Sequence, residues 1–392
     1  MELDPFDPAF QADPWPVYRW LRDHAPLHHD ARRGFWALSR FRDVVAASQD
    51  WATYSSAEGT LLERLDPSLL TATPMMLFTD PPRHDRLRRL VQKAFTPRRV
   101  AALEPFVRTT AARLVGALAA AGGGDLVAEV ATPLPMEVIF TLLGVPDADR
   151  RQLRAWMDDV LERNPDGSLP ERALAAMAAI MPYWFALVAA RRTRPDDGLL
   201  SALCDAEVET DDGRARLGDG EIVGFCALLG TAGNETVTKL LANAVVLFHR
   251  HPDAWASCIA DPARLPNAVE EALRWSSPSQ YQGRVVTRDV EWYGRTVPAG
   301  ARILLLTAAA NRDEREFPDP DRFDVDRSIP VALGFGHGVH FCLGAALARL
   351  ETRVALEELA RRMPRFAVDE AGCERVHGSN VHGFHRVPIA AA

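Results

Sequence analysis

The sequence of 392 residues predicts an α+β fold that is mostly helical, and two observations carry this prediction. Long alanine- and leucine-rich segments show the apolar periodicity of helices, whereas strand patterns are few and grouped in small clusters. The expected helices span 100–120, 171–192, 219–250 and 343–362. The expected strands span 26–30, 34–38, 282–287, 290–293 and 301–306, with a further hairpin within 366–388.

Composition indicates a soluble globular protein, since 47% of the residues are hydrophobic, 25% are charged and the net charge is −8. The length alone allows two domains. No linker and no internal repeat divides the chain, however, so we expect one domain over residues 1–392. Its bulk is expected to be helical, with a smaller β-rich region near the N-terminus.

We expect a protein of the cytoplasm, without a signal peptide or a membrane span. The first residues are acidic and contain proline, unlike a signal peptide. The most apolar run, 222–233, is about a dozen residues long, against roughly 20 for a membrane span. Five cysteines without clustered spacing indicate reduced thiols. They are Cys204, Cys226, Cys258, Cys342 and Cys373.

The segment 333–344 places one cysteine at the end of a glycine-rich turn and at the start of a predicted helix. After Cys342, the apolar residues Leu343, Leu347 and Leu350 recur at helical spacing. The free N–H groups and the dipole of a helix N-terminus favour a thiolate over a thiol. A thiolate is a nucleophile or a metal ligand.

Three roles for Cys342 follow from these residues alone. A nucleophile needs a base, and His340, two positions earlier, is poorly placed to serve as one. Zinc would use His337, His340 and Cys342, a more crowded spacing than zinc motifs have. The third role is a buried structural cysteine.

Phe335, Gly336, Gly338, His340, Cys342 and Gly344 together resemble the haem-binding loop of the cytochrome P-450 family, F-G-x-G-x-H-x-C-x-G. The resemblance implies that Cys342 is the axial ligand of the iron in haem b, and that Phe335 and Gly336 contact the cofactor. Glycines suit this position because they let the backbone approach a flat macrocycle closely.

Further segments match positions that hold the haem propionates in this family. His84 and Arg88 lie one helical turn apart, like the family's H-x-x-x-R helix. The resemblance assigns the same role to Arg284 and His340. It also identifies Glu271 and Arg274 with the E-x-x-R motif, which implies a buried structural triad completed by Arg322, or alternatively by Arg327.

A polar stretch, 231–236, interrupts the apolar pattern of the long helix expected at 219–250. It resembles the family's A-G-x-[D/E]-T signature. The resemblance implies a widened helix near Ala232 that makes room for dioxygen, a hydrogen bond from Thr236 to the bound oxygen, and delivery of protons by Glu235.

The implied function is that of a haem-thiolate monooxygenase, which inserts one oxygen atom of dioxygen into a hydrophobic small molecule. A peroxygenase or reductase on the same fold, and a haem-based sensor or carrier, are the alternatives. The pocket is expected to use 60–78, 156–184, 228–232, 278–281 and 381–384, with Gln280, Tyr281 and His382 as polar anchors.

Electrons are expected from a separate ferredoxin and its reductase, because the chain has no flavin or nicotinamide module. The basic run Arg83–Arg99, in an otherwise acidic chain, is the expected docking patch. We expect a monomer in the cytoplasm that binds neither nucleic acid nor a membrane.

Overall fold

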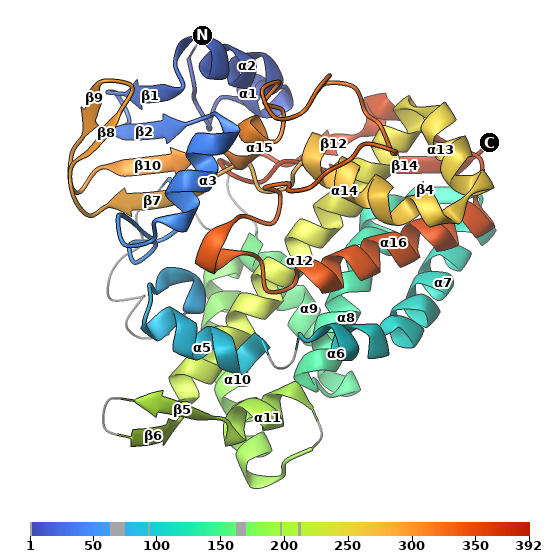
Figure 1. Cartoon of the computed structure of the whole chain (residues 1–392). Helices are drawn as coiled ribbons and strands as arrows, with labels where there is room; N and C mark the ends of the chain where they lie inside the picture. Colours follow the sequence, from blue (N-terminus) through green and yellow to red (C-terminus); the bar gives the residue numbers. More distant parts are fainter. Residues whose placement is uncertain (1, 63–74, 93–94, 162–169, 197, 211–212) are drawn as a thin grey trace.

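The computed structural model describes residues 2–62, 75–92, 95–161, 170–196, 198–210 and 213–392. The structure is 56% helical with small sheets, which confirms the predicted α+β class. A five-stranded sheet lies at one end near the N-terminus, and the helices form the rest of the molecule around the long helix α12 (Figure 1).

The described helices and strands agree closely with the expected ones. The α-helices are α1 (Pro8–Ala12), α2 (Trp15–His24), α3 (Phe41–Gln49), α5 (Arg83–Gln92), α6 (Pro97–Ala102), α7 (Glu104–Ala120), α8 (Pro133–Leu143), α9 (Asp147–Leu161), α10 (Glu171–Thr193), α11 (Leu199–Asp205), α12 (Asp219–Arg250), α13 (Pro252–Ala260), α14 (Leu265–Trp275), α15 (Thr307–Ala310) and α16 (Ala345–Arg362). Shorter helical turns are η1 (Met76–Phe78), the π-helical η2 (Val127–Ala131), η3 (Pro262–Arg264), η4 (Gly338–His340) and η5 (Glu370–Gly372).

The strands are β1 (Leu27–Asp30), β2 (Phe35–Leu38), β3 (Tyr54–Ser55), β4 (Gly123–Asp125), β5 (Glu207–Thr210), β6 (Gly213–Arg216), β7 (Gln282–Val286), β8 (Val290–Trp292), β9 (Arg295–Val297), β10 (Arg302–Leu305), β11 (Phe366–Val368), β12 (Glu374–Arg375), β13 (Phe384–Arg386) and β14 (Pro388–Ala391).

The largest sheet joins two strand clusters that are far apart in the sequence. Its order is β1-β2-β10-β7-β3, with β2 and β10 parallel and the other pairs antiparallel. Strand β10 is buried along its whole length, because neighbouring strands and α-helices cover it. The sheet therefore fixes β7, which carries Arg284, relative to the N-terminal region.

One expected helix is divided in the structure. The segment expected as 100–120 forms α6 and α7, which meet at Leu103. Pro105 lies in the first turn of α7, where its missing N–H is tolerated, and it disfavours a continuous helix through the residues before it. The hydroxyl of Thr96 accepts a hydrogen bond from the Arg99 N–H and caps the start of α6.

Helix α12 crosses the molecule as one continuous α-helix over Asp219–Arg250. Glu221 accepts a hydrogen bond from the backbone N–H of Gly218 at its start, and Arg250 lies in its last turn, so both ends complement the helix dipole. The expected interruption at 231–236 does not break the helix. Packing along both sides of α12 outweighs the helix-propensity cost of Gly233, which is about 1 kcal/mol.

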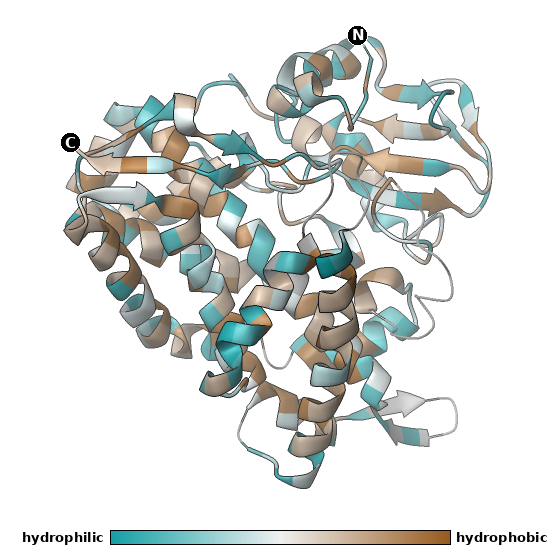
Figure 2. Cartoon of the chain, turned by 180° about the vertical axis from the view of Figure 1, so that it is seen from behind, coloured by the Kyte–Doolittle hydropathy of each residue, from teal (hydrophilic) through white to brown (hydrophobic). Residues whose placement is uncertain are grey.

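Helix α10 is the one described helix with the length and apolar composition of a membrane span. It packs against α9, α11 and α12, and Trp184 from its middle is fully buried. Three large apolar side chains on α10 are exposed instead: Leu174, Met177 and Phe185. Apolar residues run along the helices generally, whereas the projecting β5–β6 hairpin is pale or hydrophilic (Figure 2).

A buried hydrogen bond ties α12 to the π-helical turn η2. The Thr238 hydroxyl donates to the backbone carbonyl of Ala131 at 2.9 Å. We expect Thr238→Val, which keeps the shape and removes the donor, to lower the free energy of unfolding by about 1–2 kcal/mol. Urea titration followed by circular dichroism measures this change. Thr238→Ser keeps the hydroxyl and is the matched control, so an equal loss in both variants would contradict the hydrogen-bond explanation.

Candidate active site

The loop before α16 holds Cys342 through backbone geometry. Gly336 and Gly338 have φ angles of 71° and 73°, the left-handed region that glycine adopts without strain. A side chain at Gly338 would also collide with the carbonyl oxygen of Ser48 on α3. The N–H of Cys342 donates to the Phe335 carbonyl at 2.9 Å, which closes the loop and fixes the sulfur-bearing residue.

Cys342 lies just before α16, which begins at Ala345, and its side chain faces a cavity. The backbone N–H of Gly344 and the charges of Arg88 and Arg349 favour its thiolate. Burial among protein atoms nevertheless outweighs them and raises the pKa of the Cys342 thiol. The helix N-terminus alone therefore does not make this a free thiolate; a bound metal ion would, because a metal ion deprotonates a coordinating thiol outright.

A cavity of about 410 Å³ lies beside Cys342 and collects the residues that the sequence singled out. Its wall combines the cysteine loop, one face of α12, strand β7 and part of α5. All the proposed cofactor-binding residues line it, and Thr236 does as well, whereas Glu235 is not part of the wall. The lining residues predicted from the sequence are His84, Arg88, Ala232, Thr236, Arg284, Phe335, Gly336, His340 and Cys342.

One side of the cavity carries an excess of positively charged or hydrogen-bond-donating groups. Arg284 is buried, and burial lowers its pKa to about 10. Burial, together with the positive charges around it, lowers the pKa of His340 to about 2, so this ring is neutral. Its Nε2 lies 3.2 Å from the Ser56 hydroxyl.

His84 is fully buried beside His340, with 4.4 Å between the ring centroids. Its Nδ1 contacts Asp85 at 2.9 Å, but its Nε2 is buried without a partner. Arg88, one turn later, donates to the carbonyl of Phe341 at 2.6 Å. A buried imidazole nitrogen without a partner is costly, so this wall suits an anion that can accept hydrogen bonds.

On α12, Ala232, Gly233, Thr236 and Val237 form the cavity-facing side. The Thr236 hydroxyl donates to the carbonyl of Ala232 at 2.9 Å, which keeps it at the cavity wall. A Cβ atom at Gly233 would lie 3.1 Å from the Ile139 side chain, so the glycine lets α8 approach. Glu235 is half-buried on the neighbouring side of the helix.

Glu271 and Arg274 form a fully buried ion pair, with two hydrogen bonds of 2.6 and 2.8 Å. The assignment of Arg322 as the third member is wrong. Arg327, the alternative, donates to Glu271 at 3.2 Å, whereas Arg322 is largely exposed and pairs with Asp324. Three backbone carbonyls also hold the Arg327 guanidinium, and this turn geometry points Arg322 outward.

The ion pair connects to the cysteine loop through Asn311. Arg274 donates to the carbonyl of Asn311 at 2.9 Å, and the Asn311 side chain accepts from the backbone N–H of Leu333 at 2.7 Å. Leu333 begins the loop that ends in Cys342. The buried charges therefore support the loop from behind rather than contacting the cavity.

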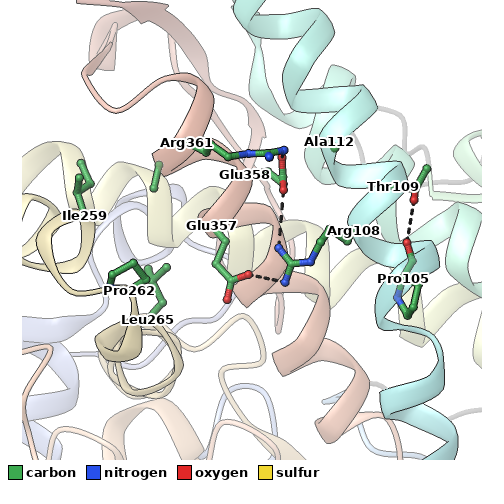
Figure 3. Close-up of a pocket in the computed structure, with 11 residues that line it drawn as sticks. Pro105, Arg108, Thr109, Ala112, Ile259, Pro262, Leu265, Glu357, Glu358 and Arg361 are labelled. Carbon is green, nitrogen blue, oxygen red and sulfur yellow. Dashed lines mark hydrogen bonds and ion pairs between the residues drawn. The ribbon is translucent and has the colours of Figure 1, made fainter.

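A larger hollow of about 880 Å³ lies elsewhere, between α7, α13 and the end of α16 (Figure 3). Its charged side chains are paired with one another: Arg108 contacts Glu357 and Glu358, and Arg361 contacts Glu358. The hollow holds none of the predicted site residues. The cavity beside Cys342 is therefore the better candidate for an active site.

The comparison with known proteins decides the family. Cytochrome P450 123 of Mycobacterium tuberculosis is 47% identical over 395 residues, covering 99% of this chain and 96% of that protein. The chain belongs to the cytochrome P450 family. The family model described as cytochrome P450 matches residues 186–371.

Two further relatives extend the comparison. The vitamin D(3) 25-hydroxylase of Pseudonocardia autotrophica is 39% identical, covering 98% of this chain and 96% of that protein. The solved structure of cytochrome P450 CYP109Q5 from Chondromyces apiculatus has a TM-score of 0.89 at 34% identity, covering 100% of this chain and 98% of that one. The protein is a haem monooxygenase, and the family binds haem b through a cysteine thiolate.

The residues of the cavity fit haem b. Cys342 presents a sulfur to the cavity, with the Gly344 N–H directed at it. The unpartnered Nε2 of His84 and the buried Arg284 suit the two propionate carboxylates. Each group that haem requires is thus present before haem is placed.

Some cavity residues escaped the sequence analysis. Arg349 on α16 lies behind the cavity wall, where it stacks on the Phe335 ring at 4.6 Å and donates to Glu270 at 2.9 Å. Glu351 is fully buried in the cavity wall, and burial raises its pKa well above the ordinary value. Helical spacing after Cys342 was the available signal for both.

The expected polar anchors of the substrate are not in the cavity wall. Gln280 bonds Tyr18 and the carbonyl of Ser277, and Tyr281 bonds Ser379, all in the protein interior. His382 is likewise buried elsewhere. Ser279, Gln282 and Asn380 take the cavity positions instead. Of the expected pocket loop 60–78, residues 63–74 lie outside the described part of the chain.

The corrected triad makes a quantitative prediction. We expect Arg327→Gln to lower the free energy of unfolding by about 3 kcal/mol, because it removes a cation from a buried carboxylate. Arg322→Gln, the matched control, should change it by less than about 1 kcal/mol, since that pair is exposed. Urea unfolding of the haem-loaded proteins measures both, and the reverse order would restore Arg322 to the triad.

Proposed function

We propose that this P450 inserts one oxygen atom of dioxygen into a hydrophobic small molecule, by hydroxylation or epoxidation, with Thr236 and Glu235 serving oxygen activation. The observation that carries the proposal is that Thr236 and Cys342 line the same cavity from separate elements. Its relatives include a 25-hydroxylase and the cyclomarin C epoxidase CymV of Salinispora arenicola, which is 40% identical.

Cys342, Phe335, Gly336 and Ala232 would contact the haem, and His84, Arg88, Arg284 and His340 would hold its propionates. When bound, the haem supplies the chemistry that activates dioxygen; the thiolate ligand donates electron density to the iron. The chain contributes ligation, orientation and exclusion of water.

Thr236 offers a hydroxyl that can both donate and accept hydrogen bonds, and its bond to Ala232 keeps the oxygen atom at the cavity wall. Glu235 is adjacent in sequence and half-buried, so it can pass protons from outside the cavity toward the hydroxyl. The neighbours of Thr236 on the cavity-facing side of α12, Ala232, Val237 and Leu240, are apolar, which disfavours bulk water near the hydroxyl.

The substrate pocket is mostly apolar, with Met76, Leu77 and Phe78 from η1 and Phe225, Leu228 and Leu229 from α12. Gln282 and Asn380 add amide groups to the wall. This lining supports a bulky hydrophobic substrate with few polar groups. CYP109E1 of Bacillus megaterium, a P450 whose structure matches this one with a TM-score of 0.86, is solved in complex with testosterone. Testosterone is therefore our first probe.

We also propose that a separate ferredoxin delivers electrons on the face formed by α5, α6 and α16. Arg89, Arg98 and Arg99 are exposed there; Lys93, of the same basic run, lies outside the described residues. A hollow of about 600 Å³ between α6, α14 and α16 includes Arg349, whose charge acts on Cys342. This is a surface close to the sulfur, and its positive charge suits an acidic partner.

A monomer in the cytoplasm completes the proposal. All five cysteines are free, and Cys204, Cys226 and Cys258 are buried thiols, as in reduced proteins. We propose no nucleic acid or membrane partner, because Arg88 of the basic run faces the cavity, Arg83 pairs with Glu221, and Arg89, Arg98 and Arg99 are assigned to the docking face.

Replacement of the sulfur tests the ligand. We expect Cys342→Ala to lose the red-shifted Soret band that a thiolate-ligated haem gives on reduction under carbon monoxide, because no other side chain supplies a thiolate to the cavity. Cys373→Ala, another free cysteine, should keep the band and is the control. Persistence of the band in Cys342→Ala would exclude the assignment.

Thr236 can be tested separately from haem binding. We expect Thr236→Ala to release at least about tenfold more hydrogen peroxide per dioxygen consumed. Without the hydroxyl, protons are no longer delivered to the correct oxygen atom. Thr236→Ser, which retains the hydroxyl, should stay close to the unmodified enzyme. The measurement couples NADH, a surrogate ferredoxin and its reductase to oxygen and peroxide assays with testosterone. Unchanged peroxide release in Thr236→Ala would overturn the role of Thr236.

The docking face predicts a charge effect. We expect Arg89→Glu combined with Arg98→Glu to raise the KM for reduced ferredoxin about tenfold at low salt and less at high salt, as charges are screened. The control Arg365→Glu alters one exposed arginine before β11, away from this face, and carries the same charge change as Arg89→Glu or Arg98→Glu alone. An equal effect of Arg365→Glu would point to net charge rather than to docking.

A further inference from the structure

Helix α12 carries a lysine in an unusual environment. The chain has two lysines, Lys93 and Lys239, against many arginines. Lys239 is only 5% exposed. Lysines are almost never buried unless a partner compensates the cost of removing the ammonium from water, so the position calls for a reason.

The charge that acts on Lys239 is that of Glu235, one helical turn earlier. Positions i and i+4 lie next to each other on a helix, and a glutamate that precedes a lysine is the favourable order. Burial lowers the pKa of Lys239, and the charge of Glu235 opposes that effect. Glu235 also precedes Thr236, so Lys239 lies beside the cavity-facing side of α12 without being part of the wall.

The hairpin near the C-terminus holds the stem of Lys239 in place. A Cβ atom at Gly383 would lie 2.7 Å from Cβ and 3.0 Å from Cγ of Lys239. These distances leave no room for a side chain at position 383. Glycine there lets the Lys239 stem lie against the backbone of the hairpin. The backbone at Gly383 therefore covers one side of the Lys239 stem.

On the outer side of Lys239 lies His385, on β13. Burial lowers the pKa of His385, and the charges of Lys239 and His377 lower it further, while Glu374 opposes them. The charged and titratable groups placed around Lys239 in the described structure are thus Glu235 on its own helix and His385 on the hairpin, with His377 and Glu374 beyond. Part of His385 remains accessible to solvent, so the group of charges reaches from the surface to Glu235.

We propose that Lys239 is a positioning residue for Glu235: its charge, one helical turn away, favours the ionised carboxylate beside Thr236, and so sets the pH range over which oxygen activation proceeds. The inference rests on the role proposed above for Glu235. An adjacent positive charge favours the ionised form of a carboxyl group. Without the charge of Lys239, Glu235 would take up its proton at higher pH.

The test compares haem-loaded enzymes across pH 5.5–9 by oxygen consumption with NADH, excess surrogate ferredoxin and reductase, and testosterone present as a probe. Oxygen consumption reports on activation whether or not the probe is oxidised. We expect Lys239→Met to move the acidic limb of the profile upward by about one pH unit. Lys239→Arg should restore the original limb. Lys239→Gln, which is polar and neutral, should give the same shift as Lys239→Met. Agreement between the two variants shows that the shift comes from the lost charge and not from a folding defect of Lys239→Met.

Glu235→Gln separates this inference from the proposed function. If both proposals hold, Glu235→Gln removes the limb, and adding Lys239→Met to it changes nothing more. If Glu235→Gln removes the limb but the neutral Lys239 variants keep the original profile, the role of Lys239 is overturned and that of Glu235 stands. If Glu235→Gln leaves the profile unchanged, the role of Glu235 fails and the inference about Lys239 fails with it.

Discussion

Two charges buried behind the cysteine loop are the constraint on which the site depends. Glu271 and Arg274 are fully inaccessible, and such a pair is tolerated only where every hydrogen-bonding group is satisfied. Arg327 and the carbonyls of Asn311 and Pro320 meet this demand, and they belong to the chain that leads into the loop. Satisfying the charges therefore brings α14 and the loop into one arrangement, and the position of Cys342 follows from it.

Motifs with fixed spacing could be located from the sequence because local geometry decides them. Helical periodicity placed α10, α12 and α16 to within a few residues, and the glycine pattern identified the loop at Cys342. His84 and Arg88 share a helix face for the same local reason. His84, Arg88 and Cys342 line one cavity. Helical periodicity does not predict that they meet, whereas the matched family motifs do.

The wrong predictions concern residues in irregular backbone, where sequence spacing does not determine the direction of a side chain. Arg322 and Arg327 both sit in a turn-rich segment, and nothing in their spacing tells which one points inward. Gln280 and Tyr281 precede β7, so strand alternation does not apply to them, and the bridge between Ser279 and Val381 turns them into the core. The low helix propensity of glycine likewise suggested an interruption of the helix at Gly233, but tertiary packing keeps α12 continuous there.

The partnerless nitrogen of His84 and the buried guanidinium of Arg284 bear on how the protein reaches its final form. In the bare polypeptide the His84 nitrogen has no hydrogen-bond partner, and the carbonyl of Gly283 and the charge of Asp80 compensate the desolvation of Arg284 only in part, so the wall around them is under electrostatic stress. A cofactor bearing two carboxylates relieves that stress only in the folded chain, and so it acts as a thermodynamic ligand of the native state. Binding of haem and folding of the chain are therefore coupled. A cell short of haem would accumulate a looser apoprotein that is more readily degraded.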